Sequence, residues 1–143
     1  MKSTTINGIV YSVGDEVIIG RVRRDGGEER LSYNTVMYYN RGIIDKITPS
    51  GYPYVRVTYE DIDNDKIREQ TFRITKNGIS DDRYHKMMPY DAEFMEKIDN
   101  LKQKKMYVQK TFKRLKSIQG MSYNDAVQIN TLLDELLIAL EDK

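Results

Sequence analysis

The chain of 143 residues contains no cysteine and no tryptophan, and it has a single histidine. Without cysteine it forms no disulfide, offers no thiolate nucleophile and cannot hold zinc through sulfur. Nucleophilic catalysis generally needs a base beside the nucleophile, and His85 lies in a polar stretch without a recognisable partner. A phosphate-binding Gly-Lys-Ser/Thr loop is also missing. The sequence therefore predicts a protein that is not an enzyme and uses no cofactor.

Long apolar runs are missing as well. The longest, Leu136–Leu140, is far shorter than the roughly 20 residues that span a bilayer. The N-terminal segment MKSTTINGIVYS has no apolar core of signal-peptide length. These features predict a soluble, cytoplasmic protein that does not bind membranes.

The chain also has almost no net charge, since its formal charge is +1 at pH 7. This argues against a strongly electrostatic, sequence-independent nucleic-acid binder. Locally the balance differs, since residues 102–116 contain seven basic side chains and no acidic one. This run predicts either a solvated helix face or a basic surface for phosphates or an acidic partner, with Lys102, Lys113 and Lys116 on the outer side. The residues of that surface are Lys102, Lys105, Lys113, Arg114 and Lys116.

Turn dipeptides between short apolar runs predict β-structure over residues 1–76. Asn7-Gly8 suits a two-residue hairpin turn because both positions accept positive φ. Gly42–Thr48 and Tyr52–Tyr59 flank Pro49-Ser50-Gly51, which predicts the clearest hairpin of the chain. Residues 28–41 fit an irregular strand or an ordered loop equally well. Residues 77–90 read as a polar connector ending near Pro89.

The hydrophobic period changes after this connector. Apolar residues at a 4-3 spacing predict a helix of about 27 residues that starts near Asp91. Gly120 suits the end of that helix, and Ser122 followed by Asp125 resembles a capping box for a second helix. Two long helices joined by a short turn predict an antiparallel hairpin over residues 91–142. Its broad apolar face favours a homodimer or a higher oligomer.

The predicted fold class is α+β, with a small antiparallel β-barrel (SH3-like) or curled sheet followed by the helical hairpin. Gly14–Ile19, Gly42–Ile47 and Tyr54–Val57 resemble the small barrels of the KOW and Tudor type. The long stretch Arg21–Arg41 departs from that pattern, which has a short loop there. The resemblance implies a small barrel and a binding module, but it implies no particular ligand.

Two groups of polar residues are candidate sites. Arginine and tyrosine side chains suit a binding surface because they stack and donate hydrogen bonds. The predicted partner or ligand surface therefore consists of Arg21, Arg23, Arg24, Tyr33, Tyr38, Tyr39 and Arg41. The second group, Asp61, Asp63 and Asp65, alternates as in a calcium loop. However, Lys66 and Phe72 stand where such a loop needs Gly and Glu, so no metal site is predicted.

These observations predict a non-catalytic binding protein. The abundance of Tyr, Lys, Asn and Ile, without cysteine, resembles accessory proteins of bacteriophages. We therefore expect a phage-type protein that engages a host protein of a defence or transcription system, in the host cytoplasm. Two alternatives stay open: a nucleic-acid-binding module that uses the barrel and the basic helix, and an oligomeric binder of a nucleotide-like ligand.

Overall fold

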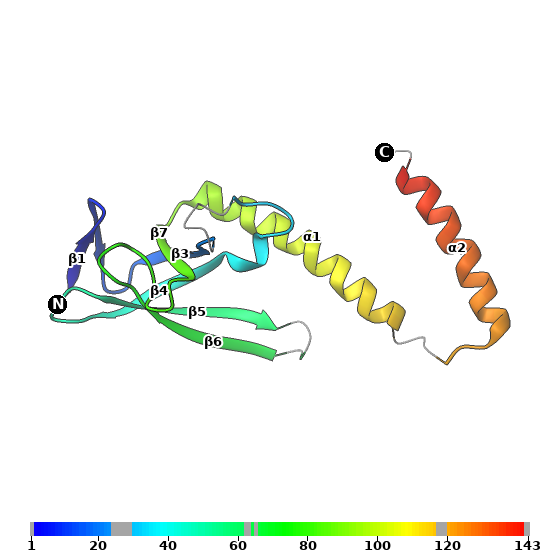
Figure 1. Ribbon diagram of the computed structural model, residues 1–143, viewed down its shortest axis with the longest axis horizontal. Coiled ribbons are helices and arrows are strands. Elements are labelled where there is room, and N and C mark those ends of the chain that lie inside the picture. The colour runs from blue at the N-terminus through cyan, green and yellow to red at the C-terminus, as the bar shows by residue number, and fades with distance from the viewer. Residues whose placement is uncertain (1, 24–29, 62–63, 65, 117–119, 142–143) are drawn as a thin grey trace. The chain divides into compact units, whose positions relative to one another are not determined.

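The computed structural model of the chain describes residues 2–23, 30–61, 64, 66–116 and 120–141 (Figure 1). It has a mixed α+β fold, with antiparallel strands followed by two helices, which confirms the predicted class. The chain forms two compact units, residues 1–108 and 109–143, which we call the sheet unit and the helical unit. The predicted division into 1–76, 77–90 and 91–142 stays a prediction.

A short hairpin begins the sheet unit. Strands β1 (Ser3–Ile6) and β2 (Ile9–Ser12) pair around Asn7 and Gly8, whose φ angles are 52° and 80°. Both positions lie in the left-handed region, as the Asn-Gly turn predicts. The hairpin buries Ile6 and Tyr11, so it contributes to the core of the unit.

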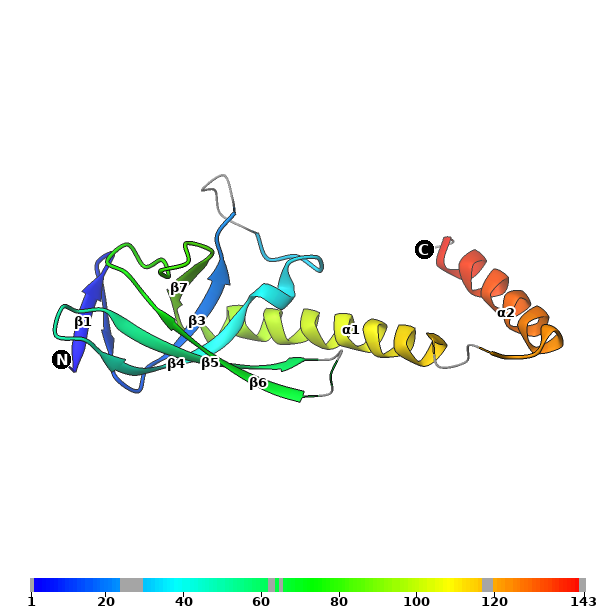
Figure 2. The same ribbon diagram turned by 60° about the horizontal axis from the view of Figure 1, so that its bottom comes forward.

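The main sheet is antiparallel and has the strand order β6-β5-β4-β3-β7 (Figure 2). The predicted hairpin of β4 and β5 is present. The sheet is not closed into a barrel, so the curled-sheet alternative is right and the KOW-like barrel is wrong. The strands are β3 (Glu16–Arg21), β4 (Asn40–Ile47), β5 (Pro53–Asp61), β6 (Lys66–Arg73) and β7 (His85–Pro89).

The polarity of edge strand β6 explains why the sheet stays open. Residues Lys66–Thr71 are all exposed, and only the end of the strand contributes Phe72 to the core. Isolated bridges join Ile74 to Ser80 and Ile79 to Lys86. The segment after β6 therefore approaches β7 only beyond the end of β6 that contains Phe72. A barrel needs continuous pairing along both edges, and the exposed part of β6 has a single apolar residue, Ile67, to support it.

Strand β7 was not predicted, because its sequence HKMMP reads as part of the polar connector. It pairs with β3 over its whole length, from Val17–Pro89 to Arg21–His85. The connector interpretation is therefore wrong for residues 85–89. A short strand that ends in proline lacks the alternation by which strands are found in a sequence.

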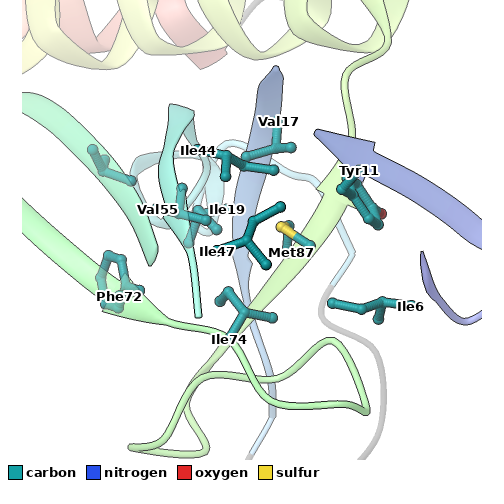
Figure 3. Close-up of a cluster of buried hydrophobic side chains, with 11 residues drawn as sticks. Ile6, Tyr11, Val17, Ile19, Ile44, Ile47, Val55, Phe72, Ile74 and Met87 are labelled. Carbon is teal, nitrogen blue, oxygen red and sulfur yellow. The ribbon is translucent and has the colours of Figure 1, made fainter. Parts of the chain in front are cut away.

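One core lies on the inner face of the curled sheet (Figure 3). Side chains from β3, β4 and β5 point toward Ile6 and Tyr11 of the first hairpin and Met87 of β7. On β3 and β5 every second residue is buried there, as expected for a half-buried strand, and a register shift between Ile44 and Lys46 changes this spacing on β4. The buried cluster consists of Ile6, Tyr11, Val17, Ile19, Ile44, Ile47, Val55, Val57, Phe72, Ile74 and Met87.

A second core joins the opposite face of β3 to helix α1 (Ala92–Lys116) and a 3-10 turn, η1 (Val36–Tyr38). It consists of Ile18, Val36, Tyr39, Met95 and Ile98. Over residues 30–39 the stretch with two possible interpretations is an ordered loop, and residues 40–41 begin β4. Residues 28–29 lie outside the described residues. The turn of this loop is held by Ser32, whose amide donates to Thr35 Oγ1 at 2.9 Å.

The two helices begin close to the residues that the sequence predicts. The Asp91 carboxylate accepts from the amide of Phe94 at 3.1 Å, and Ser122 Oγ accepts from the amide of Asp125 at 3.2 Å. Helix α2 spans Tyr123–Glu141, and Gly120 before it has φ 91°. Packing of the two helices into a hairpin stays a prediction. Within the described part of the chain, no helix is long and apolar enough to cross a membrane.

Candidate functional site

A groove of about 430 Å³ lies in the sheet unit between α1 and the outer face of β4 and β5. The strands contribute the residues that alternate with the inner core, such as Arg41 and Ile43 on β4 and Arg56 on β5. The lining consists of Met37, Asn40, Arg41, Ile43, Arg56, Thr58, Tyr59, Glu60, Met95, Asp99, Lys102 and Met106.

Helical periodicity explains the contribution of α1. Met95, Asp99, Lys102 and Met106 follow one another at intervals of four, three and four residues. This spacing places them on one face of the helix, next to the side that buries Ile98. Because α1 packs on β3, this face of the helix lies over the neighbouring strands.

Lys102 is the most perturbed charged group of the groove. Its ammonium donates a hydrogen bond to Asn40 Oδ1 at 2.8 Å. Burial lowers the pKa of Lys102 to about 8, although the nearby carboxylate of Asp99 opposes this change. A lysine removed from water in this way is suited to meet an anionic group, because such a group restores the lost stabilisation of its charge.

The two arginines of the groove have acidic neighbours. Arg41 Nη2 lies 3.9 Å from Asp99 Oδ2, and its guanidinium lies 5.6 Å from the centre of the Tyr90 ring. Arg56 Nε lies 3.1 Å from Asp45 Oδ2. The groove therefore contains charges of both signs, and both arginine side chains remain partly exposed.

The structure brings together Arg41 and Lys102, which the sequence assigned to two different surfaces. The placement of Lys102 on the outer side of the helix is wrong, because it faces β4 instead. The sequence analysis also missed Asp99 and the three methionines. The 11-residue interval between Met95 and Met106 was a signal for one helix face, but only the docking of α1 shows that this face borders a groove.

The other predicted surface residues are separated. The Arg21 guanidinium lies 4.1 Å from the centre of the Tyr38 ring. Tyr38 and His85 line a second cavity of about 160 Å³. Arg23 is exposed, and Arg24 lies outside the described residues. The prediction that Tyr39 belongs to a binding surface is wrong, because Tyr39 is buried in the second core. Its ring meets the ring of Phe94 edge-on, with 5.9 Å between the ring centres.

The basic helix surface is divided in the same way. Lys105 Nζ donates to the carbonyl oxygens of Tyr33 and Asn34 at 3.1 and 3.3 Å, so it fastens α1 to the loop before η1. It also lies 5.3 Å from the centre of the Tyr33 ring. Lys113, Arg114 and Lys116 are exposed in the helical unit, as predicted.

His85 takes part in a turn network with Asp82 and Ser80. The Asp82 carboxylate accepts from Ser80 Oγ and lies 3.0 Å from His85 Nδ1, so the acid separates the hydroxyl from the imidazole. Burial alone would raise the pKa of Asp82, but hydrogen bonds from Ser80, the Tyr84 amide and His85 outweigh it and lower that pKa. A serine nucleophile needs the imidazole itself as its neighbour, so this arrangement fixes the turn.

The predicted hairpin turn near Asp61 is consistent with its contacts. Asp61 accepts hydrogen bonds from Asn64 Nδ2 at 2.9 Å and Arg68 Nε at 2.5 Å, and these bonds lower its pKa. Asp63 and Asp65 lie outside the described residues. Among the residues that are described, no group of three or more His, Asp or Glu side chains is placed to hold a metal ion.

Comparisons with protein-family models, characterised proteins and solved structures give no match to this chain. The interpretation of the groove therefore depends on its geometry and on the chemistry of its residues.

Proposed function

We propose that this chain is a non-catalytic binding protein whose groove receives a peptide segment of a protein partner. The lining of the groove carries this proposal. Six of its twelve residues are methionine, arginine or tyrosine, the types enriched where proteins bind one another. Methionine side chains adapt to the shape of an apolar partner, and the arginines supply directional hydrogen bonds.

Mixed charge favours a protein over a nucleic acid as the occupant of this groove. Glu60 and Asp99 line it together with Arg41, Arg56 and Lys102. A phosphate backbone would be repelled by the two carboxylates, whereas a peptide can present charges of both signs. A carboxylate of the peptide beside Lys102 would match the buried ammonium best.

Composition supports a narrower version of this proposal. In it the chain is a bacteriophage accessory protein, and its partner is a host protein of a defence or transcription system. The protein then acts in the cytoplasm of the host cell. The groove is the part of the sheet unit that would bind this partner.

Affinity capture from a bacterial lysate, with and without nuclease, tests the proposal. We expect the wild-type chain to retain a protein that survives nuclease treatment. Arg41→Glu should abolish this capture, because it reverses a charge inside the groove. Lys104→Glu is the matched control, since it makes the same reversal at an exposed position on the opposite side of α1. Equal capture by all three chains, or capture of nucleic acid alone, would contradict the proposal.

A nucleic-acid-binding module is the second candidate, and the stacked Arg21–Tyr38 pair favours it. Bases stack on tyrosine and arginine in a similar way. This candidate predicts an affinity for single-stranded oligonucleotides that falls steeply with salt. A third candidate is a nucleotide-like ligand, because the volume of the groove falls in the range of about 300–1,000 Å³ of small-molecule sites. A rise in melting temperature with a nucleotide would support it.

A further inference from the structure

Helix α2 exposes nearly all of its apolar side chains. None of its described residues is buried, and Leu132, Leu136 and Leu137 are 63%, 53% and 56% exposed. Single exposed leucines are common on protein surfaces, but a continuous apolar row along a whole helix marks a contact surface. The question is therefore what covers this row.

The row is wide as well as long. At about 100° per residue it occupies an arc of about 140°, wider than the stripe of about 100° that a helix usually buries against a core. From Ala126 to Leu140 it extends for about 21 Å at about 1.5 Å per residue. Its members are Ala126, Ile129, Leu132, Leu133, Leu136, Leu137 and Leu140.

Helix α1 of the same chain offers a much shorter apolar row. Its first part, with Phe94, Ile98 and Leu101, is already packed in the second core. The remaining part, from Val108 to Leu115, extends for about 11 Å, half the length of the α2 row. The residues of α1 that are exposed before Val108 are mainly polar or charged, among them Glu96, Lys97, Asn100, Gln103 and Lys104. An intrachain hairpin would therefore leave the second half of the α2 row without an apolar neighbour.

The charges of the two helices are complementary. Over Tyr123–Glu141, α2 contains four acidic residues and no basic one. The part of α1 in the helical unit is the opposite, with Lys110, Lys113, Arg114 and Lys116 and no acidic residue. Charged residues beside an apolar seam select the partner helix. The acidic and apolar α2 is therefore complementary to the basic and apolar end of α1.

We propose that the occupant of the α2 row is a second copy of this chain. The end of α1 and the whole of α2 from each copy form a four-helix bundle, in which Leu136, Leu137 and Leu140 of one α2 pack against the α2 of the other copy. Each acidic α2 then lies between two basic α1 ends. The surface is distinct from the groove, so this inference does not depend on the proposed function.

The mass of the chain measured over a range of concentrations tests the inference. Wild type should be a dimer throughout the micromolar range by light scattering. Leu136→Asp places a charge in the middle of the row and should raise the dimer dissociation constant at least 100-fold. Thr131→Asp adds the same charge on the opposite side of α2 and should leave the dimer unchanged.

Two outcomes would overturn the inference: a wild-type chain that is monomeric at every concentration, or a Leu136→Asp chain that remains a dimer. Urea unfolding of the sheet unit, followed by tyrosine fluorescence, shows that the variant is otherwise folded. In addition, a single cysteine introduced at Leu137 gives a reporter without background, since the chain has no other cysteine. A bismaleimide should join two copies of the Leu137→Cys chain, and failure to join them would contradict the packing.

Discussion

The sheet unit and the helical unit differ in how far their apolar side chains are buried. The sheet unit buries Ile44, Val55 and Ile74 completely, whereas α2 of the helical unit buries none of its described residues. The first unit therefore contains the contacts that stabilise it. The second has apolar helix faces without such contacts, and helices of this length gain most of their stability from packing.

The largest expected effect comes from shortening one apolar side chain in each unit. Ile44→Ala removes a fully buried side chain and should lower the free energy of unfolding by about 3 kcal/mol, because it leaves a cavity in the core. Leu137→Ala should change it by less than about 0.5 kcal/mol when it is added to the Leu136→Asp chain, which we expect to be monomeric. Urea denaturation followed by circular dichroism measures both. Equal losses would remove the contrast between the units.

A smaller test concerns the close packing of β4 on β5. A Cβ atom at Gly42 would lie 2.5 Å from Val55 Cγ1, which is itself buried. Gly42→Ala should therefore destabilise the sheet unit by about 2 kcal/mol through overpacking. Gly14→Ala is not a suitable control because Gly14 has φ 91°, so Lys104→Ala on the exposed side of α1 serves instead. An unchanged urea midpoint for Gly42→Ala would show that Val55 on β5 can shift to admit the added methyl group without loss of stability.

The pH dependence of stability tests the environment of Lys102. Because its folded pKa is about 8 and its ordinary value 10.5, the unfolded chain binds more protons than the folded chain between these values. The contribution of this group to stability therefore rises as the pH increases through that window. Lys102→Met should be more stable than wild type at pH 7, and the difference should shrink by about 1–2 kcal/mol toward pH 10. A constant difference would place Lys102 in water.

The smallest expected effect compares the caps of the two helices. Asp91→Ala removes the cap of α1 and should lower the unfolding free energy of the sheet unit by about 1 kcal/mol. Ser122→Ala removes the cap of α2 and should reduce helix content without moving the urea transition of the sheet unit. A shift of that transition by Ser122→Ala would show that the units unfold together.

Local signals were sufficient to predict most elements but not the groove. Asn7-Gly8 and Asp91 specify a turn and a helix start within a few residues, and the structure places both as predicted. Gly120 as the end of the first helix stays a prediction, because residues 117–119 lie outside the described part of the chain. Strand β7 was not predicted because its sequence HKMMP shows no alternation of apolar and polar residues. It becomes a strand by pairing with β3, which is distant in the sequence. Lys102 was misplaced for the same reason, since its environment depends on where α1 meets β4.

The groove and the surface that we assign to self-association share one helix. Lys102 and Met106 line the groove, and the same α1 continues without a break through Val108 to Lys116. Helix formation is cooperative, so an event that orders the last turns of α1 also favours order in the turns before them. If the groove binds a partner and copies of the chain assemble as we propose, the two are therefore linked equilibria. If one strengthens the other by some factor, thermodynamics requires the reverse effect to have the same size.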